Sequence, residues 1–134
     1  MEVFLRRINM NIDETLDYIN KADDDTLFIL WTNADETAAK LMLFMYAENS
    51  IKQGMWKDVM IIVWGATTKL LAESEAMQAE VKRLKDLGVK FSACITCAKE
   101  LGVEDKIEAL GLDLIKWLKP LTALIKGGKK LISV

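Results

Sequence analysis

The feature that most constrains the fold is a six-residue run at residues 59–64, which reads VMIIVW. Every side chain in it is apolar, without the alternation expected of a strand that has one face in water. Such a run is typical of a strand buried on both faces, as in the middle of a parallel sheet. Residues 26–31 (TLFILW) form a similar run earlier in the chain. The segment between the two runs is long enough for the helix that a parallel crossover requires.

Strand and helix patterns alternate along the rest of the chain. Asn33 is expected to cap the first crossover helix, with Glu36 as its capping-box partner. The predicted helices end near residues 53, 87, 101, 110 and 127. Pro120 is expected in the first turn of the last helix. The remaining strands are predicted at residues 89–94, 112–116 and 129–134. Five strands separated by helices predict a three-layer α/β/α sandwich around a mainly parallel five-stranded sheet.

Residues 1–25 precede this α/β domain of residues 26–134 and are interpreted as an N-terminal extension that is partly helical. Asn11 and Glu14 have the spacing of a capping box and predict a short helix after them. Residues 3–5 (VFL) are apolar. They are expected either to cover an end of the sheet or to reach a neighbouring subunit.

The composition excludes several functions. The chain has no histidine, so it cannot build a Ser-His-Asp triad or a Cys-His pair, and two cysteines alone do not supply a usual zinc site. The net charge of −2 gives no reason to expect nucleic-acid binding. No metal and no organic cofactor are expected, and the chain lacks the GxGxxG and GxxxxGK[ST] motifs that would support nucleotide binding.

The apolar runs bear on location. The longest, residues 41–47 and 59–66, are far shorter than the roughly 20 residues that span a bilayer, so no membrane span is expected. Arg6, Arg7 and Asn9 interrupt the N-terminus where a signal peptide would need an apolar stretch. A cytoplasmic location with reduced cysteines is therefore predicted.

The segment Cys94-Ile-Thr-Cys97 is the main chemical signal. Cys94 is expected to end a strand, and Cys97 to lie one turn into the next helix. Amides at a helix start stabilise a thiolate, and a second thiol nearby can resolve a mixed disulfide or share a persulfide. The alternative is that both cysteines are small buried hydrophobic residues. The position at a strand end favours function, because ligands bind beyond the carboxyl ends of parallel strands.

The same edge of the predicted sheet gathers the other candidate pocket residues. They follow the first, second and fourth strands: Trp31, Thr32, Asn33, Gly65, Ala66, Thr67 and Trp117. The tryptophans could wall a pocket, although tryptophans at such positions more often belong to the core or to subunit contacts.

The stretch of residues 88–103 (GVKFSACITCAKELGV) resembles the cysteine motif of the DsrE/DsrF-like sulfur-relay family. In that motif a strand after a helix-ending glycine delivers a cysteine, and a glycine follows eight positions later, here Cys94 and Gly102. The segment WGA at residues 64–66 is also similar to the family. The resemblance covers residues 26–134 and includes the order of the elements.

This resemblance implies a small sulfur carrier that holds sulfur as a persulfide on Cys94. Cys97 is similar to the second cysteine of one subgroup and would assist. The resemblance also implies a homo-oligomer, a trimer or hexamer, that exchanges sulfur with donor and acceptor proteins. The apolar segment of residues 41–47 agrees with burial against a second surface.

Two other functions stay open from the sequence. One is a non-catalytic oligomeric binding module that uses the strand-end pocket. The other is a dithiol oxidoreductase. Against the second, thioredoxin-like proteins place CxxC after an early strand and set a cis-proline opposite it, whereas the sole proline here, Pro120, is predicted to open a helix.

Overall fold

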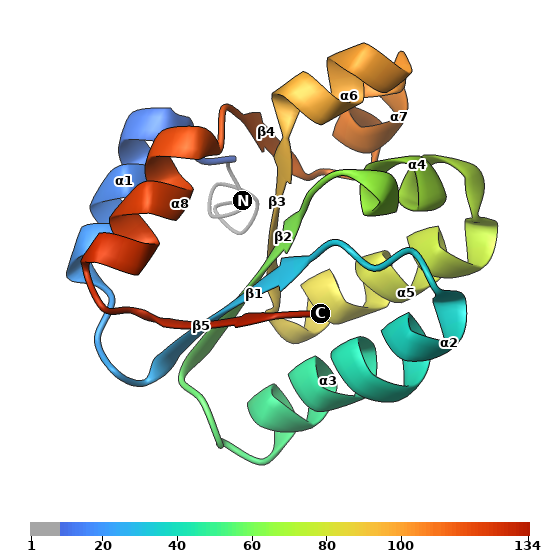
Figure 1. The fold of residues 1–134 in the computed structure, drawn as a ribbon. Coiled ribbons are helices and arrows are strands. Elements are labelled where there is room, and N and C mark those ends of the chain that lie inside the picture. Colours follow the sequence, from blue (N-terminus) through green and yellow to red (C-terminus); the bar gives the residue numbers. More distant parts are fainter. Residues whose placement is uncertain (1–8) are drawn as a thin grey trace, which may run out of the picture.

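The computed structural model describes residues 9–134, so the predicted packing of residues 3–5 lies outside the described residues. Five strands form one sheet in the order β4-β3-β2-β1-β5, and every neighbouring pair is parallel (Figure 1). The strands are β1 (Thr26–Trp31), β2 (Asp58–Val63), β3 (Lys90–Cys94), β4 (Asp113–Ile115) and β5 (Lys130–Ser133). The predicted parallel α/β fold is confirmed.

Helices cover both faces of this sheet. They are α1 (Ile12–Lys21), α2 (Glu36–Ala38), the π-helix η2 (Ala39–Phe44), α3 (Met45–Lys52), α4 (Ala66–Glu73), α5 (Glu75–Leu87), α6 (Ile95–Leu101), α7 (Glu104–Ala109) and α8 (Leu118–Lys126). Strands β1 to β4 step across the sheet in one direction, and right-handed crossovers therefore place α2 to α7 on one face. The step from β4 back to β5 reverses direction, so α8 lies on the opposite face beside α1 (Figure 1).

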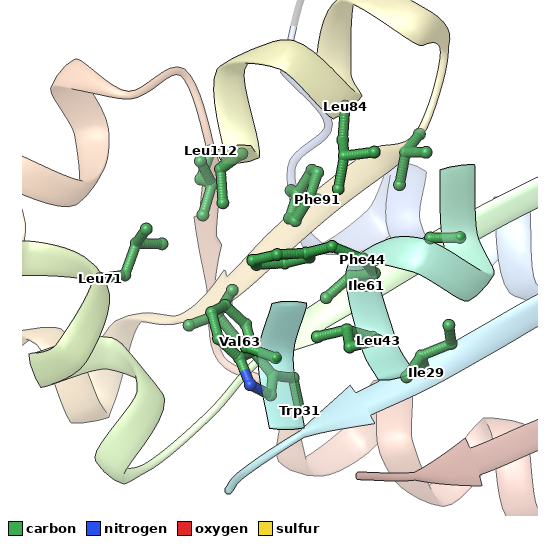
Figure 2. Close-up of a cluster of buried hydrophobic side chains, with 14 of the residues drawn as sticks. Ile29, Trp31, Leu43, Phe44, Ile61, Val63, Leu71, Leu84, Phe91 and Leu112 are labelled. Atoms are coloured by element: carbon green, nitrogen blue, oxygen red, sulfur yellow. The ribbon is translucent and has the colours of Figure 1, made fainter. Parts of the chain in front are cut away.

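The larger core lies between the sheet and α2 to α7. The strands contribute alternate residues to it, such as Ile29 from β1 and Ile61 from β2, because successive side chains of a strand point to opposite faces. Phe44 packs edge-on against Trp31, with ring centroids 5.3 Å apart (Figure 2). This side of the sheet is therefore held together mainly by buried aliphatic and aromatic side chains.

The smaller core lies between the sheet and the pair α1 and α8. It takes the other residues of the same strands, including Phe28 and Met60, together with Ile19 from α1. Trp117 is also buried here, and its Nε1 donates a hydrogen bond of 2.8 Å to Ser92 Oγ. The described part of the predicted N-terminal extension thus supplies one of the two helices that cover this face.

The start of the first crossover helix differs from the prediction. Asn33 does not cap it: its Oδ1 accepts from the Asp35 N–H, and its own N–H donates to the Val134 carbonyl. Asp35 is the cap, because its Oδ1 accepts from the Ala38 N–H at 2.8 Å. Asn33 was a wrong assignment because its Oδ1 is used by the Asp35 N–H in a local turn, so α2 begins two residues later than predicted, at Glu36 with Asp35 as its cap.

Two predicted helix starts are confirmed, and one predicted helix is divided in two. Asn11 and Glu14 form the predicted capping box, and Pro120 lies in the first turn of α8. The helix predicted to end at residue 87 is divided, since Ser74 adopts an extended conformation, ends α4 and caps α5 through its side chain. Among residues 9–134, no helix combines the length and apolar character needed to cross a bilayer.

Candidate functional site

The two cysteines lie at the point of the sheet where the connections diverge. Cys94 is the last residue of β3 and pairs with Ile115, the last residue of β4. The chain leaves β3 through α6, which packs against α4 and α7, and it leaves β4 towards α8, which packs against α1. Ligands in open α/β sheets bind in the crevice that such a divergence creates. The topology therefore places the cysteine segment where the sheet is open to a ligand.

The two thiols have different surroundings. Both cysteines are free, but Cys94 is only 4% exposed and belongs to the smaller core, whereas Cys97 is partly exposed. Cys94 is the N-cap residue of α6, yet its side chain accepts no capping hydrogen bond. The amide contact expected at Cys94 is found at Cys97 instead, whose Sγ accepts from the Gly65 N–H at 3.3 Å.

Gly65 can present this N–H because of its backbone conformation. Its φ of 70° and ψ of −130° lie in a region that essentially only glycine adopts. The flanking turn is fixed by Thr67, whose Oγ1 donates to the Trp31 carbonyl at 2.7 Å and accepts from the Trp64 N–H at 3.2 Å. The turn after β2 is thus shaped to aim one amide at the Cys97 sulfur.

The protonation of Cys97 reflects opposing influences. Burial raises the pKa of its thiol most strongly, the Gly65 N–H lowers it, and the neighbouring Cys94 thiol raises it further. The net result is a raised pKa, because the loss of hydration outweighs one amide contact. Cys97 is therefore mainly a protonated thiol at neutral pH, and its nucleophilic reactions should accelerate as the pH rises.

Cys97 lines a hollow of about 300 Å³ between α6 and the start of α4. The lining residues are Gly65, Ala66, Lys69, Thr96, Cys97, Glu100 and Leu101. The glycine and alanine leave room beside the sulfur, and each helix contributes one charged side chain. The hollow therefore offers a thiol, carbon-rich walls and two opposite charges to a small molecule.

Of the seven pocket residues predicted besides the cysteines, Gly65 and Ala66 line this hollow. Thr67 is buried beneath the turn, where it holds the backbone in place. Thr32 and Asn33 are exposed at the end of β1, and the N–H groups of both donate to the Val134 carbonyl. These three residues belong to the same edge of the sheet but do not line the hollow.

The two predicted tryptophans are core residues. Trp31 is buried in the larger core, and its Nε1 donates to the Asn33 carbonyl at 3.1 Å. Trp117 is buried in the smaller core against Ser92. Each indole therefore satisfies its N–H internally, as buried tryptophans generally do.

Thr96 lies within the predicted cysteine segment, but three lining residues were not predicted: Lys69, Glu100 and Leu101. Helical spacing could have identified the last two, because residues three and four positions after Cys97 share its face of α6. Lys69 is related in the same way to Ala66 on α4. The pairing of these two helix faces depends on the tertiary structure.

Comparisons with known proteins add one relative. No family model matches the chain, and no curated protein matches it. Fold and site define a three-layer α/β protein with a pair of free thiols at a strand end. A solved structure of a conserved protein of unknown function from Bacteroides thetaiotaomicron is 37% identical, with a TM-score of 0.82, and the match covers 85% of this chain and 100% of that one. The chain belongs to the same family as that protein. The resemblance to the DsrE/DsrF-like family stays a prediction.

Proposed function

We propose that this protein is a sulfur carrier that holds a sulfane sulfur on its Cys94–Cys97 pair. The observation that carries the proposal is the environment of Cys97, a free thiol that faces a hollow and accepts an N–H from Gly65. The sequence favoured Cys94 as the carrier. Because Cys94 is only 4% exposed, the proposal gives the entry of sulfur to Cys97 and the assisting role to Cys94.

The transfer step needs no external oxidant. The Cys97 thiolate attacks the terminal sulfur of a donor persulfide, R–S–SH, a new S–S bond forms at Cys97, and the donor S–S bond breaks. The donor leaves as R–S⁻ and takes up the proton that Cys97 released. The Gly65 N–H supports the thiolate during this step, as an amide donor does for any developing anion. Cys94 can then share the sulfur by the same exchange: its thiolate attacks the outer sulfur of the Cys97 persulfide, the persulfide forms on Cys94, and Cys97 leaves as a thiolate.

Intact-mass measurement tests the proposal. Protein incubated with a persulfide donor should gain the mass of one sulfur, and a reductant should remove it. Cys97→Ser should abolish the gain, whereas Cys94→Ser should keep the initial uptake. If no donor adds sulfur to the wild type, the carrier function is wrong and a non-catalytic binding module becomes the better interpretation.

A dithiol oxidoreductase is the second candidate. It is favoured by the spacing of the two free thiols, since Cys94 ends β3 and Cys97 lies in the first turn of α6. This function predicts the loss of two hydrogens on mild oxidation, without any gain of sulfur. The same mass measurement therefore separates the two functions.

We also propose that the protein is a cytoplasmic homo-oligomer, a trimer or hexamer, that exchanges sulfur with partner proteins. The apolar stretch around η2 supports an oligomer. Its buried members pack in the larger core, but four others are exposed: Leu41, Met42, Met45 and Tyr46. Light scattering should show a multiple of the 15.1 kDa chain mass, and a monomer at micromolar concentration would contradict the proposal.

A further inference from the structure

Two opposite charges line the hollow beside Cys97. Lys69 comes from α4 and Glu100 from α6, and both side chains are exposed. Within residues 9–134, neither takes part in an ion pair. The hollow therefore presents a cation and an anion that form no ion pair with any other side chain of the described residues.

This arrangement selects among sulfur compounds by charge. Lys69 alone would favour an inorganic anion such as thiosulfate, but Glu100 repels the same anion. A cysteine within a peptide chain carries neither a free carboxylate nor a free ammonium group. A free amino acid carries both groups on one carbon, so it can satisfy Lys69 and Glu100 together.

The size of the hollow agrees with such a ligand. A volume of about 300 Å³ corresponds to roughly ten water molecules of about 30 Å³ each, which is enough for a small amino acid with a sulfur-bearing side chain. The carbon-rich wall formed by Ala66 and Leu101 suits the short aliphatic part of that molecule. Cys97 supplies the reacting sulfur at the same wall.

Building on the proposed function, we propose that the hollow binds zwitterionic aminothiols, with the persulfide of free cysteine as the sulfur donor. Lys69 holds the carboxylate, Glu100 holds the ammonium group, and the terminal sulfur meets Cys97. The Cys97 thiolate takes that sulfur, the donor S–S bond breaks, and free cysteine leaves with the proton. No other reactant is needed.

Sulfur uptake from two matched donors tests this inference. The first is cysteine persulfide, and the second is the persulfide of N-acetylcysteine methyl ester, which lacks both charges. We expect the wild type to react at least about fivefold faster with the charged donor, since two exposed ion pairs contribute. Lys69→Met and Glu100→Gln should each lower the ratio of the two donor rates roughly two- to fivefold. Lys99→Met removes a lysine charge on α6 that does not line the hollow, and it should leave the preference for the charged donor unchanged.

A second measurement does not depend on sulfur transfer. S-methylcysteine is an inert zwitterion and should slow the alkylation of Cys97 by iodoacetamide, whereas its N-acetyl methyl ester should not. Lys69→Met should weaken this protection roughly two- to fivefold. If no donor transfers sulfur but the protection is seen, the carrier function fails and the zwitterion site stands. Equal rates with the two donors, or equal protection by the two thioethers, would overturn the site.

Discussion

The two faces of the sheet differ in what they bury. The face under α2 to α7 carries a large, mainly apolar core built around residues such as Phe44 and Ile61. The face under α1 and α8 is smaller, and its cluster includes Cys94, with Cys97 packed against it, as well as the Trp117 indole bonded to Ser92. The same strands serve both faces through alternate residues. The larger face therefore buries most of the apolar side chains, while the two thiols pack at the edge of the smaller cluster, beside the hollow formed by α4 and α6.

The largest expected effect tests the role of the larger core. Phe44→Ala removes a buried ring that packs against Trp31, and it should lower the free energy of unfolding by about 3–5 kcal/mol. Urea denaturation followed by circular dichroism measures this change. Ile125→Ala on α8 is the matched control, because it shortens an apolar side chain that is 63% exposed, and it should change the stability by less than about 1 kcal/mol. Similar effects of the two substitutions would contradict the assignment of the core.

The next prediction concerns the buried polar contact of the smaller face. Ser92→Ala leaves the Trp117 Nε1–H without its acceptor and should cost about 1–3 kcal/mol. A double-mutant cycle with Trp117→Phe measures the coupling between the two residues. The cost of Ser92→Ala should shrink in the Trp117→Phe background, because no donor is then left unpaired. Strictly additive costs would mean that the hydrogen bond contributes nothing specific.

A third prediction uses pH to probe β4 on the smaller face. Asp113 is 7% exposed, and burial raises the pKa of its carboxyl to about 6. The Met10 N–H and Lys85 lower this pKa, and Glu14 raises it. The unfolded value is about 3.9, so the folded state holds the extra proton between about pH 4 and pH 6. The Asp113 carboxyl therefore contributes its full stabilisation below about pH 4, and this contribution is lost as the pH rises through 6.

The variant Asp113→Asn isolates that effect. A two-unit shift corresponds to at most about 3 kcal/mol, and we expect roughly 1–2 kcal/mol because the carboxyl keeps some contact with solvent. The stability of the variant relative to the wild type should increase by this amount between pH 4 and pH 7, as measured by urea denaturation at both values. A constant difference across that range would show that Asp113 does not titrate as described.

These two faces also explain what the sequence could and could not predict. The order of strands and helices follows from local patterns, such as the apolar run in β2 and the capping box of α1, and it was predicted correctly. The cap at Asn33 failed because its Oδ1 accepts from the Asp35 N–H, while the Val134 carbonyl, about a hundred positions away, binds its backbone N–H at the end of β1. The lining of the hollow was predicted only in part, because Lys69 reaches the hollow through the packing of α4 against α6. Contacts between distant segments leave no local signal.

The smallest expected effect concerns a buried hydroxyl at the edge of the smaller face. The Tyr18 ring packs edge-on against Phe28 at 6.0 Å, and the Lys90 ammonium lies 5.5 Å from its centroid. The hydroxyl itself is buried and has no hydrogen-bond partner among the described residues. Its pKa is raised by burial first and then by Asp58 and Asp23, so the group stays neutral at all ordinary pH values.

Removing that hydroxyl should therefore cost nothing. Tyr18→Phe keeps the ring contacts and eliminates an unpaired polar atom, so the free energy of unfolding should stay within about 0.5 kcal/mol of the wild type or increase. Tyr18→Leu is the matched comparison, because it also loses the aromatic contacts with Phe28 and Lys90, worth about 0.5–1.5 kcal/mol. A loss of more than 1 kcal/mol in Tyr18→Phe would show that the hydroxyl has a bonded partner in solution, and that this edge of the smaller face is better satisfied than its described contacts indicate.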